Sequence, residues 1–280
     1  MNHHAYHRPR GLAEALALKS ATPGSRFLAG GTNLLVQMDR RKLEIPALIS
    51  LRGLDQLKPI EVNGGVRLGA LTTLSELIAH PVLGERYPAL VAAARAMGSV
   101  QIRNVATVAG NLVNASPAAD LAPSLIALDA RVELSSALGT RTVALTDFFV
   151  GPGRTALADD ELLTAVLVAA PAPGSRAVYL RIGRVKKDPA LASVAAARGP
   201  DGTVRLAAGA VAPVPMRLRA AEAVLGGEAP RAEAIVEAQR LAAAEVSPLT
   251  DIRASADYRR HLVGVLVGRA LAELSENGQR

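Results

Sequence analysis

Two consecutive glycines, Gly30 and Gly31, separate a short apolar segment from a helix start in Phe27-Leu28-Ala29-Gly30-Gly31-Thr32-Asn33-Leu34. Glycine lets the backbone turn sharply and approach its neighbours closely, so this order predicts a strand, a tight turn and a helix. Free amides at a helix N-terminus attract anions, which makes a phosphate a candidate ligand. Turns of this composition also occur without a ligand, and this one matches neither the Walker loop nor the G-x-G-x-x-G fingerprint.

A second glycine segment, Thr107-Val108-Ala109-Gly110-Asn111, is interpreted as a loop; it is followed by the polar stretch from Asn114 to Asp120 and then by an apolar helix pattern. Its residues are small or carry hydrogen-bonding groups, so several donors are available without bulk. Two such segments are suited to hold a diphosphate from both sides. Asp120 has two compatible interpretations: a ligand contact, or an N-cap of the helix that follows it.

The first 170 residues alternate helical and extended patterns before antiparallel pairing begins, which predicts a small α/β unit followed by a larger sheet. Asn63-Gly64-Gly65 favours positive φ and predicts a hairpin between strands at 60–62 and 66–68. The other predicted helices are 12–18, 33–42, 73–78, 88–97 and 121–128, and the other predicted strands are 26–28, 47–51, 131–134 and 161–168.

Pro171-Ala172-Pro173-Gly174 would interrupt any regular element, and we expect a domain junction there. Beyond it, Asp201-Gly202 predicts a hairpin turn within a small antiparallel sheet that is backed by helices. The predicted strands are 178–185, 191–197 and 204–211, and the predicted helices are 217–225, 231–244 and 257–274.

The chain has no cysteine, which excludes disulfides, thiolate zinc sites and cysteine-ligated iron–sulfur clusters within it. His3, His4 and His7 lie near the N-terminus, while His80 and His261 stand alone, so no metal site is predicted. The sequence shows neither a secretory signal pattern nor an apolar run long enough to span a bilayer. A cytoplasmic protein without a transmembrane segment is therefore expected.

A formal net charge of +7 makes nucleic-acid binding an alternative, because clustered cations bind phosphates. The basic residues are scattered among 25 acidic ones, and four tyrosines and three phenylalanines leave little for a base-stacking platform. The charge therefore permits nucleic-acid binding without indicating it.

Four motifs together resemble the FAD-binding medium subunit of the xanthine dehydrogenase and carbon monoxide dehydrogenase family, the molybdenum hydroxylases. The resemblance covers essentially the whole chain, and the two glycine motifs occur in the family's order. The motifs are Tyr6-His7-Arg8-Pro9, the segment 29–35, Gln101-Ile102-Arg103-Asn104 with 107–111, and the segment 115–120.

The resemblance implies an α+β fold: a two-lobed FAD-binding domain of the vanillyl-alcohol-oxidase (PCMH) type, followed by an antiparallel sheet with a helical bundle. It places the FAD-binding domain at 1–170, with lobes at about 1–56 and 57–170, and the C-terminal domain at 175–280. The cofactor contacts that it implies are Phe27, Leu28, Ala29, Gly30, Gly31, Thr32, Asn33, Leu34, Thr107, Val108, Ala109, Gly110, Asn111, Asn114, Asp120, Leu163 and Arg181.

The sequence departs from the family pattern at several positions. Ala109 replaces the first glycine of the commoner G-G-N pattern, and Arg181 falls where relatives often carry lysine, so a solvated strand charge is its alternative interpretation. Met97 occupies a position where some relatives place an aromatic residue near the flavin, and a core role is expected for it. The absence of cysteine excludes relatives that carry an additional cluster-binding insertion.

The implied function is electron transfer, with no catalytic side chain, from iron–sulfur clusters in a partner through FAD to NAD, oxygen or a quinone. The implied partners are a large molybdopterin-binding subunit and a small [2Fe-2S] subunit, assembled as a dimer of heterotrimers. The loop at Lys186-Lys187-Asp188-Pro189 either borders the flavin or is a charged turn. Two alternatives remain: a stand-alone UDP-N-acetylenolpyruvylglucosamine reductase type of enzyme, and a basic nucleic-acid- or protein-binding module.

Overall fold

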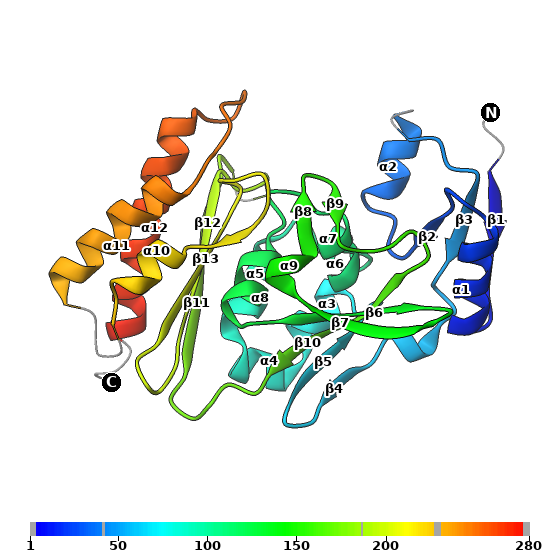
Figure 1. The fold of residues 1–280 in the computed structure, drawn as a ribbon, viewed down its shortest axis with the longest axis horizontal. Coiled ribbons are helices and arrows are strands. Elements are labelled where there is room, and N and C mark those ends of the chain that lie inside the picture. The colour runs from blue at the N-terminus through cyan, green and yellow to red at the C-terminus, as the bar shows by residue number, and fades with distance from the viewer. Residues whose placement is uncertain (1–3, 41–42, 186, 227–230, 277–280) are drawn as a thin grey trace.

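The computed structural model describes residues 4–40, 43–185, 187–226 and 231–276. The chain runs from a small α/β layer at the N-terminus, through a larger sheet with helices, to a second sheet that carries the C-terminal helices (Figure 1). Within the described ranges, no helix combines the length and apolarity that crossing a bilayer requires.

The N-terminal layer is a parallel sheet with the strand order β1-β3-β2. The central strand is buried at every position, which explains why all its residues except Ser50 are apolar. This layer confirms the predicted α/β unit, although the short first strand was not predicted; the expected helix end at Lys42 lies outside the described residues. Its elements are β1 (Ala5–His7), α1 (Leu12–Ala21), β2 (Arg26–Leu28), α2 (Leu34–Asp39) and β3 (Ala47–Ser50).

The middle sheet is antiparallel, with the strand order β4-β5-β10-β6-β7. The predicted hairpin is present: Val62 pairs with Val66, and Gly64 in the turn has a φ of +63°. Its strands are β4 (Ile60–Val62), β5 (Gly65–Gly69), β6 (Arg131–Ser136), β7 (Gly139–Ala144) and β10 (Leu162–Ala169).

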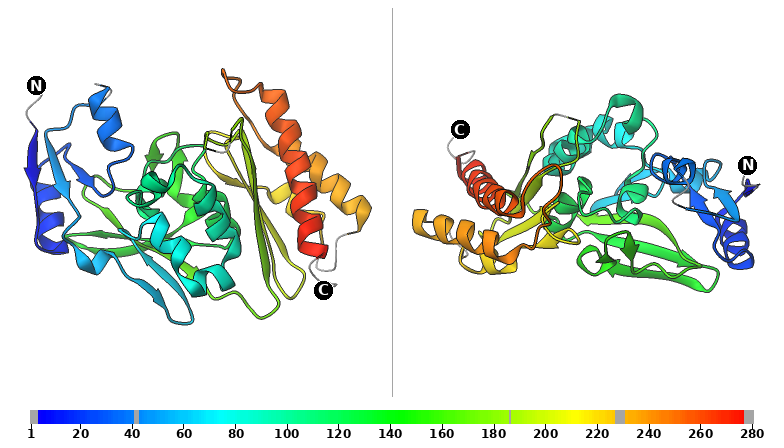
Figure 2. Two further views of the ribbon diagram at one scale, coloured as in Figure 1. Left: turned by 180° about the vertical axis from the view of Figure 1, so that it is seen from behind. Right: turned by 90° about the horizontal axis from the view of Figure 1, so that it is seen from above.

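A series of short helices connects β5 to β6 and lies between the middle sheet and the C-terminal sheet (Figures 1 and 2). A capping box starts the first of them: the hydroxyl of Thr73 accepts from the amide of Glu76, whose carboxylate accepts from the amide of Thr73. These helices are α3 (Leu74–Ala79), α4 (Pro81–Arg86), α5 (Pro88–Ala96), α6 (Val100–Arg103), α7 (Val108–Val113) and α8 (Leu121–Ala127). Short elements flank them: η1 (Asp55–Leu57), α9 (Leu145–Phe148), β8 (Phe149–Gly151) and β9 (Arg154–Thr155).

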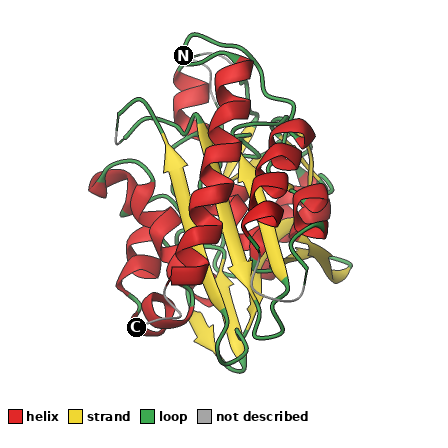
Figure 3. Ribbon diagram, turned by 90° about the vertical axis from the view of Figure 1, so that its left-hand side faces the viewer, coloured by secondary structure: helices red, strands yellow, loops and turns green. Residues whose placement is uncertain are grey.

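The C-terminal sheet is antiparallel, with the strand order β11-β12-β13-β14. Its strands are β11 (Arg176–Ile182), β12 (Ala192–Arg198), β13 (Val204–Gly209) and β14 (Met216–Arg217), and its helices are α10 (Arg219–Ala223), α11 (Ala232–Glu245) and α12 (Ala256–Glu276). Helices α11 and α12 cover its outer face (Figures 1 and 3). The expected junction at 171–174 lies in the loop between β10 and β11.

Strand β12 lies between two apolar cores. Ala192, Val194 and Ala196 belong to the core formed with α11 and α12, whereas Ala195 and Ala197 belong to the core that includes α5 and α8. Small side chains on both faces let helices approach the sheet closely from either side. The C-terminal sheet is thereby packed against the helices next to the second glycine segment.

Candidate functional site

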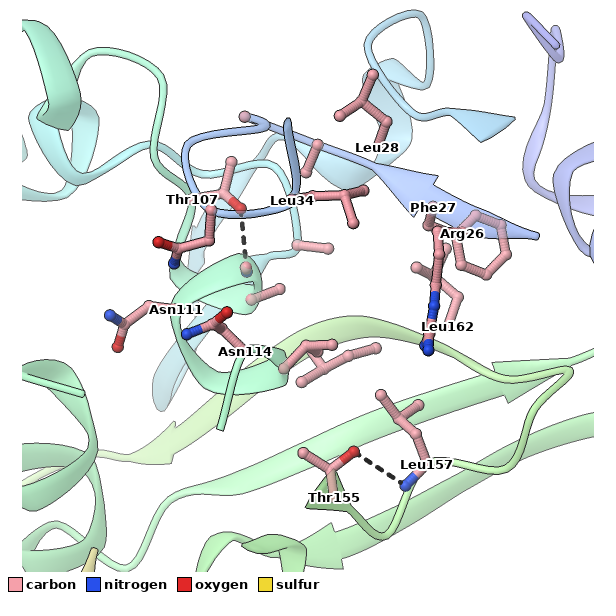
Figure 4. Close-up of a pocket in the computed structure, with 18 of the residues that line it drawn as sticks. Arg26, Phe27, Leu28, Leu34, Thr107, Asn111, Asn114, Thr155, Leu157 and Leu162 are labelled. Atoms are coloured by element: carbon pink, nitrogen blue, oxygen red, sulfur yellow. Dashed lines mark hydrogen bonds between the residues drawn. The ribbon is translucent and has the colours of Figure 1, made fainter. Parts of the chain in front are cut away.

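A cavity of about 810 Å³ lies where the N-terminal layer, α7 and the segment between β9 and β10 meet (Figure 4). Its size falls within the range of about 300–1,000 Å³ that is typical of small-molecule and cofactor pockets. Fourteen of the residues implied by the family resemblance line it: Phe27, Leu28, Ala29, Gly30, Gly31, Thr32, Asn33, Leu34, Thr107, Ala109, Gly110, Asn111, Asn114 and Leu163.

The first glycine turn packs directly on the segment that precedes the second. A Cβ atom at Gly30 would overlap the backbone carbonyl of Val105, so only glycine allows this close approach. Gly31 has a φ of +72°, in the left-handed region where residues with a side chain are strained. The two glycines therefore have separate roles: one brings the two segments together and the other turns the chain into α2.

The second glycine segment is the first turn of a helix, which corrects its interpretation as a loop. Thr107 is the N-cap of α7, and its Oγ1 accepts from the amide of Gly110 at 3.1 Å (Figure 4). The amide of Val108 donates to the carbonyl of Thr72 at 3.0 Å, which ties the turn to the core. Val108 is fully buried and does not line the cavity, although the resemblance had implied a contact there.

Asn111 carries a buried polar atom without a hydrogen-bond partner among the described residues. Its Oδ1 is unpaired, whereas its Nδ2 makes a 3.4 Å contact with the sulfur of Met97. An unsatisfied buried acceptor is costly unless a ligand or water bonds to it. Met97 also lines the cavity, so it contributes to the cavity wall as well as to the packing that the sequence predicted.

Charged residues that the sequence reasoning missed also line the cavity: Lys19, Arg26, Arg154, Asp159 and Glu161. Burial lowers the pKa of Lys19, although the negative charge of Asp159 opposes that effect. Arg26 projects into the space between the N-terminal layer and Leu162 (Figure 4). The only feature of the sequence that could have indicated a role for Arg26 was its position at the start of a short strand next to the glycine turn.

The wall between β9 and β10 was also missed. Leu157 and Leu162 add apolar surface, and the Oγ1 of Thr155 accepts from the amide of Leu157 at 3.4 Å (Figure 4). This irregular segment lies far along the chain from both glycine motifs and has no periodic pattern of its own. Only the folded chain brings it to the site.

Asp120 and Arg181 lie outside the cavity, in a buried network. Tyr179 donates to the Asp120 carboxylate at 3.0 Å, and Arg181 Nε lies 3.6 Å from the same oxygen. Asp120 is the N-cap residue of α8, as one interpretation expected, but its side chain makes no capping bond. The solvated strand charge expected for Arg181 is wrong, because its side chain is only 12% exposed. Burial raises the pKa of Asp120, while Arg181 and the Tyr179 hydroxyl partly offset that effect.

Arg181 also holds backbone from two other segments. It donates to the carbonyl of Ala96 at 2.7 Å and to that of Asp188. The loop that was predicted either to border the flavin or to form a charged turn is thus tied to the end of α5. Lys186 in this loop lies outside the described residues, and the described residues of the loop do not line the cavity.

The cavity fits FAD by its chemistry. Glycine turns leave room for a diphosphate, Lys19, Arg26 and Arg154 supply positive charge, and apolar walls cover ring surfaces. The unpaired Oδ1 of Asn111 can accept from a hydroxyl or a ring N–H. Among the described residues, no group of histidine, aspartate and glutamate has the arrangement of a metal site.

Two family models match the chain. Residues 2–171 match the FAD binding domain in molybdopterin dehydrogenase, and residues 178–274 match the CO dehydrogenase flavoprotein C-terminal domain.

Relatives match over nearly the full length. The chain is 31% identical to the xanthine dehydrogenase FAD-binding subunit of Escherichia coli O157:H7, over 96% of this chain and 95% of that one. It is 33% identical to the glyceraldehyde dehydrogenase medium chain of Sulfolobus acidocaldarius, over 97% and 98%. A solved carbon monoxide dehydrogenase from Hydrogenophaga pseudoflava superposes with a TM-score of 0.93 at 34% identity, covering 96% of both chains.

These matches confirm the expected family, the α+β fold class and FAD as the cofactor, and they favour neither the stand-alone reductase nor the basic binding module. The chain belongs to the FAD-binding medium-subunit family of the molybdenum hydroxylases, and it is an oxidoreductase flavoprotein subunit that transfers electrons.

Proposed function

We propose that FAD occupies the 810 Å³ cavity with its diphosphate between the Gly30-Gly31 turn and the start of α7. The observation that carries the proposal is the direct packing of these segments, since Gly30 lies against the backbone of Val105. The fourteen lining residues named above are the proposed contacts, and Lys19, Arg26 and Arg154 are added to them. Val108, Asp120 and Arg181 support the site from outside its wall.

FAD supplies the redox chemistry because it exchanges electrons singly or in pairs. The residues of the chain bind it, orient it and exclude water from it. Asn111 accepts a hydrogen bond through Oδ1, and Thr107 keeps the amides of α7 in place through its cap. Apolar side chains, including Leu157 and Leu162, cover one wall. No side chain of this chain is required as a nucleophile or a general base.

The proposed electron donor is an iron–sulfur cluster in a partner subunit. The cysteine-free chain cannot ligate such a cluster through thiolates, so the clusters belong to a small [2Fe-2S] subunit and the molybdopterin to a large one. The similar proteins are themselves named as a subunit and a medium chain. We propose a dimer of such heterotrimers in the cytoplasm, with NAD, oxygen or a quinone as the external acceptor.

We propose that the chain has two domains, of which the first binds FAD. Residues 1–170 bind FAD, with lobes at about 1–56 and 57–170, and residues 175–280 form the second domain. The two core clusters support this division, although part of β12 contributes to the first core as well.

Affinity purification of the tagged chain from its own cells tests the assembly. The expected result is co-purification of a large molybdopterin-binding chain and a small cysteine-rich chain, together with about one FAD for each copy of this chain. A folded chain that carries flavin but purifies alone would contradict the assembly and leave FAD binding intact. A folded chain that binds no FAD after reconstitution would contradict the function itself.

A further inference from the structure

One wall of the cofactor cavity is an irregular segment, Ala156–Glu161, which we call the wall loop. Leu157, Ala158, Asp159 and Glu161 from this loop line the cavity. The loop begins after β9 and ends where β10 starts, so no sheet hydrogen bonds hold its middle. Two backbone hydrogen bonds fix its ends, from the amide of Ala156 to the carbonyl of Phe148 at 2.8 Å and from the amide of Glu161 to the carbonyl of Ala158 at 3.1 Å. Side-chain contacts complete its positioning.

Arg141 supplies those contacts from outside the cavity. It lies on β7, one of the two edge strands of the middle sheet, and it does not line the cavity. Its Nε donates to Glu161 Oε1 at 2.6 Å, and its Nη2 donates to Glu161 Oε2 at 2.8 Å and to the carbonyl of Ala156 at 2.7 Å. One guanidinium thus holds both ends of the wall loop.

Glu161 completes the arrangement from within the loop. Its Oε2 accepts from the amide of Ala158 at 2.8 Å, so the carboxylate fixes the backbone at the residue that follows Leu157. The side chain of Glu161 is 9% exposed, whereas that of Arg141 is 48% exposed. A bidentate pair is the geometry in which an arginine fixes position as well as charge.

We propose that Arg141 is a positioning residue for FAD: through Glu161 it locks the wall loop in the shape that the cofactor binds. The inference rests on FAD binding in this cavity. Loss of the lock leaves the fold intact, since a partly exposed ion pair contributes little to overall stability. The loop then has to be ordered when FAD binds, and that ordering lowers the affinity.

The Arg141–Glu161 pair, which we call the lock, depends on pH because it requires Glu161 to be ionised. The hydrogen bonds from Arg141 hold the pKa of Glu161 below its ordinary value of 4.5, with burial opposing them and the Ala158 amide assisting. The other charged groups that line the cavity are Lys19, Arg26, Arg154 and Asp159. Burial lowers the pKa of Lys19, while the negative charges of Asp159 and of Asp160 in the wall loop raise it. The lock persists until the pH falls through the depressed pKa of Glu161.

The matched experiment compares Arg141→Gln with Arg240→Gln in the full chain. Arg240 makes the same bidentate pair with Glu237, at 2.8 and 2.6 Å, on helix α11 away from the cavity. Fluorescence titration with FAD is expected to show about a tenfold weaker affinity for Arg141→Gln and no change for Arg240→Gln. Arg141→Lys keeps the positive charge but cannot donate two parallel hydrogen bonds to the carboxylate. It is expected to bind FAD more weakly than the wild type and more tightly than Arg141→Gln.

Two further readouts separate positioning from a direct contact of Glu161 with FAD. Glu161→Gln and the double variant Arg141→Gln/Glu161→Gln are expected to bind FAD as weakly as Arg141→Gln alone, because both side chains act through one lock. In the wild type, FAD affinity is expected to fall when the pH drops through the lowered pKa of Glu161, because protonation breaks the lock. Arg141→Gln has already lost the lock, so this fall in affinity at low pH is expected to be absent from it.

Wild-type affinity in Arg141→Gln, or losses that add in the double variant, would overturn the lock while the wild-type chain still binds FAD. An unchanged pH profile in Arg141→Gln would also overturn it. A wild-type chain that binds no FAD would instead overturn the function on which the inference rests.

Discussion

At position 31, one backbone angle is needed for the fold, and we expect the same angle to affect cofactor binding. Its φ of +72° is tolerated at little cost only by glycine, and a Cβ there would lie 2.8 Å from the Cδ1 of Leu35 and 3.2 Å from that of Leu28. Both leucine side chains are able to adjust, whereas the backbone contact at Gly30 cannot relax. Substitution at Gly31 is therefore the gentler probe of the turn.

Gly31→Ala and Gly64→Ala form a matched pair, because both positions have positive φ and only Gly31 lines the cavity. Each substitution is expected to lower the free energy of unfolding by about 1 kcal/mol through backbone strain. Only Gly31→Ala should weaken FAD binding, by about tenfold or more, because it distorts the Gly30-Gly31 turn that is proposed to hold the FAD diphosphate. Urea unfolding and FAD titration check both effects; equal FAD affinity in the two variants would count against the diphosphate model.

Asn111→Leu separates cofactor binding from stability. The substitution removes a buried acceptor that has no partner among the described residues, so the free energy of unfolding without FAD should change by less than about 1 kcal/mol. FAD affinity should fall about tenfold, which corresponds to the loss of one hydrogen bond. A cofactor-free variant that is strongly destabilised, or one that binds FAD normally, would show that Oδ1 does not face the cofactor.

Among the elements, the start of α8, strand β11 and the end of α5 are joined by one buried ion pair. Asp120 at the start of α8 meets Arg181 on β11, and Arg181 also bonds to the carbonyl of Ala96 at the end of α5. Burial makes the charged carboxylate costly, so its pKa is raised although Arg181 and Tyr179 lower it in part. The pair holds the C-terminal sheet against the helices behind the cavity.

Arg181→Met should destabilise the fold by about 3 kcal/mol at neutral pH, because it leaves a buried charge without its cation. Without Arg181, the pKa of Asp120 rises further. Protonation of Asp120 removes the unpaired charge, so the loss of stability relative to the wild type should shrink as the pH falls through this raised pKa. The free energy of unfolding, measured against pH, follows this change.

The double variant Asp120→Asn/Arg181→Met serves as the control for this ion pair. It should recover much of the lost stability and remove the pH dependence of the deficit. FAD affinity in the double variant also tests the two cofactor contacts that the family resemblance implied. A large loss of affinity with restored stability would show that the pair contacts the cofactor directly.

Elements with local signals could be predicted from the sequence, whereas those that depend on tertiary contacts could not. The turn at Gly64 and the strand at 26–28 have the predicted positions. Helix α7 was interpreted as a loop because Gly110 and Asn111 are poor helix formers, and only the cap from Thr107 and the bond to the Thr72 carbonyl stabilise it. The edge strand β7 was missed because its outward residues are exposed and show no apolar alternation.

For the whole molecule, the site combines segments that are far apart in sequence. The glycine motifs are recognisable because close backbone approach requires glycine, and both line one cavity. Arg26, Arg154 and the wall loop were not recognisable, since surface arginines and irregular segments have many ordinary explanations. The fold alone decides that they face the same space.

The most direct test of the account is a crystal structure of the chain reconstituted with FAD. The account predicts one FAD in the cavity, with its diphosphate between the Gly30-Gly31 turn and the start of α7 and a hydrogen bond to Asn111 Oδ1. FAD bound elsewhere on the folded chain, or a diphosphate that contacts neither glycine segment, would contradict it.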